Sequence, residues 1–103
     1  MDEKDVALRL SQLRTKKDVS AREMSLSIGQ NAGYINHIET GQGFPSLPVL
    51  FFICEYLKIT PSEFFDLENK NPEKLNKILE LLKKLDDEQL ELIEKLLKNM
   101  VKN

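Results

Sequence analysis

The residues from Asn31 to His37 place hydrogen-bonding side chains on one face of a predicted short helix. Ile35 and Ile38 lie three positions apart and predict the buried side of that helix. The other residues of the stretch therefore mostly face away from the core: Ala32, Gly33, Tyr34, Asn36 and His37. Asparagine, tyrosine and histidine side chains both donate and accept hydrogen bonds. The chemistry that this face can do is recognition of a polar surface.

Other kinds of chemistry find no support in the sequence. It has no glycine-rich phosphate loop, no nucleophile beside a general base, and no cluster of histidine, cysteine and carboxylate residues with metal-ligand spacing. His37 is the single histidine and Cys54 the single cysteine. We therefore expect no enzymatic activity, no metal site and no cofactor. We also expect Cys54 to be an unreactive core residue, because no basic neighbour surrounds it.

The segment 20–40 must position the recognition face, and its pattern predicts two short helices joined at a glycine. Ser20 and Glu23 have the spacing of a capping box at the start of the first helix, and Thr60 and Glu63 have the spacing of a second one further along the chain. Gly29 follows where a helix ends best in a left-handed residue, a conformation that only glycine adopts cheaply. Asn31 is placed to cap the second helix. Two helices joined by a short turn form a helix-turn-helix, whose second helix fits the major groove of DNA.

Apolar, capping and turn residues recur in a fixed order through the first two thirds of the chain. They are Leu10, Leu13, Arg14, Ser20, Glu23, Met24, Ile28, Gly29, Ile35, Ile38, Glu39, Gly41, Pro45, Ser46, Leu50, Leu57 and the run Thr60-Pro61-Ser62-Glu63-Phe64-Phe65. In type and spacing they resemble the lambda-repressor-like, or XRE, family of helix-turn-helix regulators over residues 8–66. The resemblance implies an all-α fold with a five-helix lambda-repressor-like DNA-binding domain, which we place at residues 1–68. It also implies a partly buried ion pair between Arg14 and Glu39.

The resemblance further implies which side chains reach DNA. In the family, base edges are contacted by the first residues of the recognition helix, predicted here at residues 31–40, and by one residue a turn further on. Ala32 and Gly33 depart from the family's frequent long polar residues, so neighbouring amide, phenol and imidazole groups must supply most of the polar readout. Backbone phosphates would be held by residues on either side. The complete predicted DNA-binding set is Lys17, Ala21, Arg22, Asn31, Ala32, Gly33, Tyr34, Asn36, His37, Thr40 and Gln42.

Plainer alternatives stay open for several members of this set. Tyr34 could instead pack over Met24 or Leu26, and His37 could be an ordinary surface residue. The formal net charge of the chain is −2, whereas DNA-binding domains are usually basic. A local positive face is still expected, because positions 8 to 22 contain only one acidic residue and five basic residues. The basic residues are Arg9, Arg14, Lys16, Lys17 and Arg22. The alternative is that these are ordinary solvated helix charges.

The segment 69–103 predicts a hairpin of two amphipathic helices. The first begins at Asn71-Pro72, and Asp86 with Gln89 has the spacing of a cap for the second. Each helix carries an apolar stripe at spacings of three, four and three, formed by Leu75, Ile78, Leu82 and Leu85 and then by Leu90, Ile93, Leu97 and Met100. Two helices alone cannot bury both stripes together with the further leucines beside them. We therefore expect the hairpin to dimerise as a four-helix bundle; the alternative is that it folds back on Phe51 and Phe52.

Together these features predict a homodimeric, sequence-specific regulator of transcription that binds double-stranded DNA, with repression implied by the family alone. A second hypothesis is an antitoxin-like or other protein-interaction module whose hairpin binds a different protein. No apolar run approaches the ~20 residues that a membrane span requires, so no membrane association is expected. The single cysteine suits a reducing compartment, and we predict a cytoplasmic location.

Overall fold

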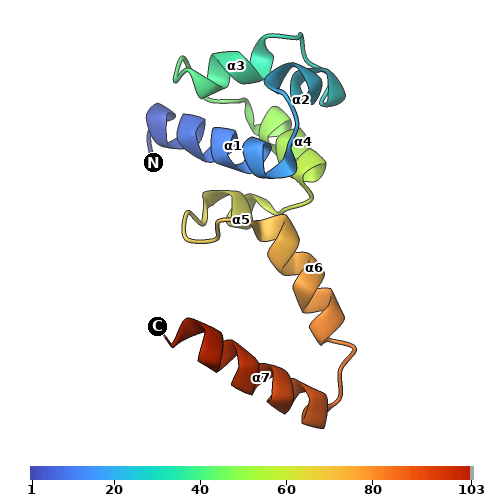
Figure 1. The fold of residues 1–103 in the computed structure, drawn as a ribbon. Helices are drawn as coiled ribbons and strands as arrows, with labels where there is room; N and C mark the ends of the chain where they lie inside the picture. Colours follow the sequence, from blue (N-terminus) through green and yellow to red (C-terminus); the bar gives the residue numbers. More distant parts are fainter. Residues whose placement is uncertain (103) are drawn as a thin grey trace. The chain divides into compact units, whose positions relative to one another are not determined.

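The computed structural model describes residues 1–102 and contains seven helices, with no strand among those residues (Figure 1). The helices are α1 (Glu3–Lys17), α2 (Ala21–Ser27), α3 (Tyr34–Glu39), α4 (Leu47–Leu57), α5 (Pro61–Phe65), α6 (Pro72–Leu82) and α7 (Asp87–Val101). The predicted all-α fold is confirmed. The chain divides into two compact units, one spanning Met1–Glu73 and the other beginning at Lys74. None of the described helices has both the length and the apolar character to cross a membrane.

Capping side chains fix where most helices begin. The capping boxes predicted at Thr60 and Asp86 are confirmed, because in each the side chains and backbone groups bond reciprocally. Ser46 caps α4. Only one of the two hydrogen bonds of the capping box predicted at the start of α2 is formed. Ser20 Oγ accepts the backbone N–H of Glu23 at 3.0 Å, but α2 lacks the reciprocal bond from the glutamate.

The core of the first unit takes a fully buried side chain from each of its five helices. These side chains are Leu10, Met24, Ile35, Ile53 and Phe64, each 0% exposed. Phe64 therefore fills the core, while Phe65 remains 45% exposed and meets it edge-on, with 5.2 Å between the ring centroids. Cys54 is buried, and the burial raises the pKa of its thiol to about 11. The reactive thiolate is therefore scarce at neutral pH, as expected for an unreactive core residue.

Arg9 corrects the predicted positive face, because it lies inside the fold and is only 1% exposed. Its Nε donates to the carbonyl oxygen of Phe64 at 2.6 Å, and its Nη2 donates to that of Glu63 at 2.7 Å. These carbonyls close α5, where a helix leaves its last acceptors without internal partners. Burial lowers the pKa of Arg9, and the charge of Asp66 partly offsets this effect. Arg9 therefore docks α5 onto α1 and is withdrawn from any outer surface.

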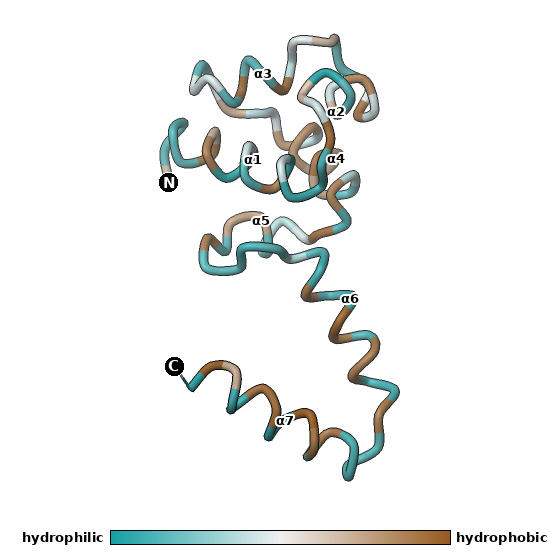
Figure 2. The backbone as a smooth tube through the Cα atoms, in the orientation of Figure 1, coloured by the Kyte–Doolittle hydropathy of each residue, from teal (hydrophilic) through white to brown (hydrophobic). Residues whose placement is uncertain are grey.

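In the second unit, α6 and α7 carry their apolar residues at helical intervals (Figure 2). The predicted starts at Pro72 and after Asp86 agree with the structure. Leu85 was placed in the first helix, but α6 ends at Leu82, and Leu85 lies in the following turn. Its N–H donates to the Leu82 carbonyl at 3.1 Å, a tight-turn bond that cannot continue the helix. Much of the stripe is exposed, with Leu75 at 45% and Leu97 at 47%.

Arg9→Met should lower the free energy of unfolding by about 2–4 kcal/mol, because the buried Phe64 carbonyl and the partly buried Glu63 carbonyl lose their charged donors. The matched control is Arg22→Met, which removes an exposed arginine and should change stability by less than about 0.5 kcal/mol. Urea unfolding followed by circular dichroism measures both. Equal losses in the two variants would contradict the role given to Arg9.

Candidate nucleic-acid interface

The turn between α2 and α3 depends on one glycine. Gly29 has φ +79°, the left-handed conformation predicted for it. Its N–H donates to the Leu26 carbonyl at 3.1 Å, and the N–H of Gln30 donates to the Ser25 carbonyl at 2.9 Å. These bonds satisfy carbonyls at the end of α2 while the chain reverses. A residue with a Cβ would be strained at Gly29 although no neighbouring atom lies within 4 Å of the added carbon.

The recognition helix is shorter than predicted. It was expected over residues 31–40, but α3 spans Tyr34–Glu39. Asn31 does not cap it: Asn31 Oδ1 accepts the N–H of Gly33 at 3.1 Å, and its carbonyl accepts the N–H of Tyr34 at 3.1 Å. An asparagine side chain that bonds the backbone two residues on stabilises a turn in competition with a helix. Ala32 therefore lies in a turn before α3, and Gly33 occupies the N-cap position.

Ser25 joins the two helices of the motif and was missed in the sequence. It is 0% exposed, and its Oγ donates to the Ala21 carbonyl at 2.7 Å and accepts the N–H of Ile35 at 3.0 Å. An N–H of the first turn of α3, which has no partner within the helix, is thus bound by a side chain of α2. One feature of the sequence could have indicated this role. Ser25 occupies an apolar position in the helical pattern formed by Ala21, Met24, Ser25 and Ile28.

The other end of α3 is held by the ion pair that the resemblance implied. Arg14 Nε and Nη2 donate to the two carboxylate oxygens of Glu39 at 2.7 and 2.9 Å. The pair is partly buried, with side-chain exposures of 20% and 11%. Arg14 Nη1 also donates to the Val19 carbonyl at 2.8 Å, so one guanidinium joins α1, α3 and the α1–α2 loop. Hydrogen bonding to Glu39 raises the pKa of Arg14, against the opposing effect of burial.

Between these two attachments, the outer side of α3 presents Asn36 and His37, both exposed. Beyond the helix, Gln42 Nε2 donates to Thr40 Oγ1 at 2.7 Å, and Thr40 Oγ1 donates to the His37 carbonyl at 2.9 Å. Tyr34 is half-buried and packs against the core of the first unit. Burial raises the pKa of the Tyr34 phenol, and a hydrogen bond from the backbone of Ser46 opposes the shift.

The basic side chains near α2 are fewer than the sequence predicted. Arg9 and Arg14 are engaged inside the fold. Lys17 Nζ lies 3.4 Å from a Glu73 carboxylate oxygen and 5.4 Å from the centroid of the Tyr56 ring. Lys16 and Arg22 are exposed, whereas Ala21, at the start of α2, is half-buried. The positive face thus reduces to a few side chains beside the α2–α3 motif. Its phosphate contacts would therefore be few.

A family model described as a helix-turn-helix domain matches residues 8–70, which is more than half of the chain. The match contains the α2–α3 motif together with α4 and α5. No curated protein and no solved structure matches the chain significantly.

Ser25→Ala should destabilise the protein by about 1–3 kcal/mol, because the buried N–H of Ile35 loses its acceptor. Ser27→Ala is the matched control, since this serine lies on the same helix and is exposed; its effect should stay below about 0.5 kcal/mol. Chemical denaturation of both variants measures the difference. A Ser25→Ala protein as stable as the Ser27→Ala protein would show that this hydrogen bond does not hold α3.

Proposed function

Because the chain belongs to the helix-turn-helix domain family, we propose that it is a homodimeric, sequence-specific DNA-binding regulator of transcription, acting as a repressor. One observation carries the proposal. The short helix α3 is attached at its start by Ser25 and at its end by Glu39, and it presents polar side chains outward between them. A rigidly held helix with an exposed polar face is what the major groove admits.

Base readout is assigned to Asn36 and His37, with Asn31 and Gly33 at the leading edge of the same face. An asparagine can bond two atoms of adenine at once, and a good bidentate contact discriminates by about 1–3 kcal/mol. The backbone at Gly33 has negative φ, and an added Cβ would meet only Asn31 Oδ1 at 3.8 Å. The fold itself therefore does not require glycine there, which supports a close approach of the backbone to DNA.

Phosphate contacts are assigned to residues that flank the recognition face: Arg22 and the backbone of Ala21 on one side, and Thr40 and Gln42 on the other. Each phosphate neutralised by a cation adds about 0.9 to the salt slope of the binding constant. Lys17 is the weaker member of this group, since Glu73 and Tyr56 already engage its ammonium. With so few free cations, we expect weak non-specific binding and a shallow dependence on salt.

Dimerisation is assigned to the hairpin, through Leu75, Ile78, Leu82, Leu85, Leu90, Ile93, Leu97 and Met100. The support is exposure: Met100 is 65% exposed and Leu97 47%, on helices whose other sides are charged. Monomeric soluble proteins rarely expose contiguous apolar patches of this kind. A twofold dimer would place two copies of α3 on half-sites about 34 Å apart on one side of the duplex. Repression would follow from occupying an operator that overlaps a promoter in the cytoplasm.

The same exposed hairpin supports a second candidate, in which it binds a different protein in the manner of an antitoxin while the first unit binds DNA. The acidic balance of the chain favours a protein partner over additional nucleic-acid contacts. Co-purification of a second chain in defined proportion would favour this candidate over the homodimer.

Selection of binding sites from random duplex DNA, at near-physiological salt, tests the proposed function. We expect enrichment of an inverted repeat with half-sites one helical turn apart. Asn36→Ala/His37→Ala should remain folded but lose most of the enrichment, because its exposed side chains contribute readout and not stability. Asn99→Ala, which removes an exposed asparagine of α7, should select the same sequence as the parent. Absence of any enriched sequence from the folded parent protein would contradict the proposal.

A further inference from the structure

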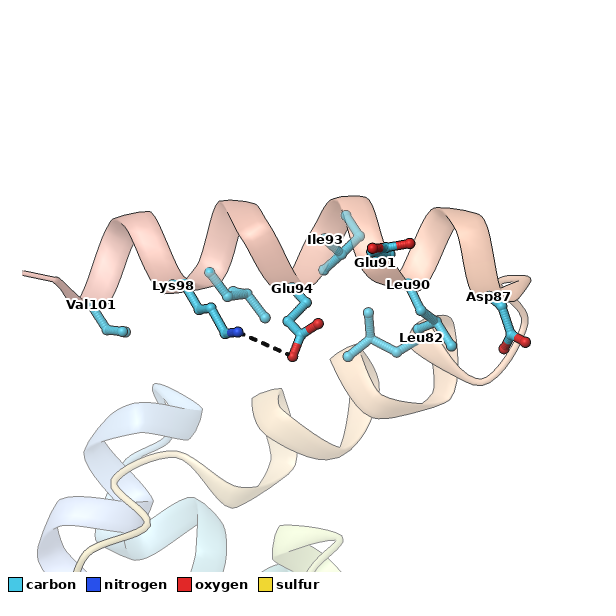
Figure 3. Close-up of a pocket in the computed structure, with 9 residues that line it drawn as sticks. Leu82, Asp87, Leu90, Glu91, Ile93, Glu94, Lys98 and Val101 are labelled. Atoms are coloured by element: carbon cyan, nitrogen blue, oxygen red, sulfur yellow. Dashed lines mark ion pairs between the residues drawn. The ribbon is translucent and has the colours of Figure 1, made fainter.

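The second unit contains an open groove along α7 (Figure 3). It has a volume of about 600 Å³, and its apolar lining includes Leu90, Leu97 and Val101 from α7 and Leu82 from the end of α6. Leu82 reaches toward α7 only where the hairpin turns, near Leu90 (Figure 3). The rest of the lining has no apolar neighbour from α6, so the hairpin leaves room for another helix.

One edge of this groove is acidic, because at 100° per residue its charged residues all lie on the same side of the apolar stripe of α7. Asp87, Glu91 and Glu94 border it from α7, and Lys98 is the one basic residue among the residues that line it. Lys98 Nζ lies 3.6 Å from a Glu94 carboxylate oxygen in an exposed pair, and the lining keeps a surplus of acidic over basic residues. A helix that fits this groove should therefore carry an apolar face bordered by basic side chains.

The apolar face of α6 has that composition. Leu75, Ile78 and Leu82 define the face by their spacing, and at 100° per residue Lys74 borders it on one side. Lys83 borders it on the other side from the position directly after α6, where its N–H donates to the Leu79 carbonyl at 3.0 Å. Lys83 Nζ lies 3.1 Å from a Glu80 carboxylate oxygen, but the two side chains are 71% and 69% exposed. An ion pair as exposed as this one holds the lysine only weakly.

The lengths of α6 and α7 are also compatible with this packing. Helix α6 has 11 residues and α7 has 15, which correspond to about 16 and 22 Å at 1.5 Å per residue. The first helix can thus lie along the groove of the second without overhanging it.

We propose that the groove along α7 is filled by α6 of a second copy of this chain, and reciprocally, so that two hairpins exchange helices around a twofold axis. This arrangement rests on the homodimer of the proposed function and specifies which helices meet. It is isologous, as twofold interfaces are, and it pairs the basic border of α6 with the acidic rim of α7 in both halves.

Charge reversal in the full-length protein tests the pairing. Lys74→Glu/Lys83→Glu places acidic residues at the two borders of the α6 face, and Glu91→Lys/Glu94→Lys places basic residues on α7. Each variant alone should weaken the dimer by about 10- to 100-fold, because attractive rim pairs become repulsive in both halves of the interface. Mixing the two variants, or combining all four changes in one chain, should restore association to within about threefold of the parent, since every helix pair is again complementary.

Sedimentation velocity over a range of concentrations measures association, and circular dichroism confirms that each variant stays helical. The control is Lys77→Glu/Lys84→Glu, which makes the same change in net charge at positions that 100° per residue places away from the apolar face. Its dimer should match that of the parent.

Three results would overturn the pairing. If Lys74→Glu/Lys83→Glu dimerises like the parent while Glu91→Lys/Glu94→Lys does not, α7 pairs with α7 and the homodimer itself stands. If the four-fold variant fails to recover, the lysines that border the α6 face do not meet the acidic residues of α7. If the parent protein is monomeric at every concentration, the homodimer of the proposed function is lost as well, while DNA selection by the first unit remains an independent result.

Discussion

The bidentate ion pair between Arg14 and Glu39 is the constraint on which the recognition surface depends. Helix α3 has only six residues, and a helix that short is unstable in isolation, because the cost of its first turn is never recovered by propagation. Its orientation must therefore come from tertiary contacts. The ion pair fixes its last turn on α1, the Ser25 hydroxyl fixes its first turn on α2, and Ile35 and Ile38 are buried between these points. What remains outside is a face whose direction is set by the rest of the unit.

Three of the basic residues that a DNA-binding protein could offer to phosphates are engaged inside this fold. Arg9 closes α5, Arg14 holds α3, and Lys17 lies beside Glu73. The formal net charge of −2 counts all three residues, so little of their positive charge is left on the outer surface to meet phosphates. In the proposed homodimer, affinity for DNA would then depend more on base contacts and on two linked copies than on charge, since linking two binding units raises affinity without new contacts. Dimerisation through the exposed hairpin would thus strengthen the binding of DNA by α3.

Local signals explain which parts of the structure could be predicted from the sequence. The boxes at Thr60 and Asp86 and the left-handed Gly29 are decided by residues within a few positions of one another, and all three predictions are confirmed. The start of α3 could not be predicted in this way, because two local solutions compete at Asn31, a helix cap and a turn, and the turn is formed. The roles of Arg9 and Ser25 depend on partners 55 and 10 positions away. A basic or hydroxyl residue at an apolar position of a helical pattern is the only trace that such a partner leaves in the sequence.

The central claim is that the exposed face of the α2–α3 motif is the surface that meets DNA. Backbone amide chemical shifts of the ¹⁵N-labelled protein, followed while a selected duplex is added, test it most directly. The account predicts that the largest changes fall on residues 20–23 and 31–42, with small changes on the outward side of α7. Changes centred on the hairpin, with the amides of α3 unmoved, would contradict it.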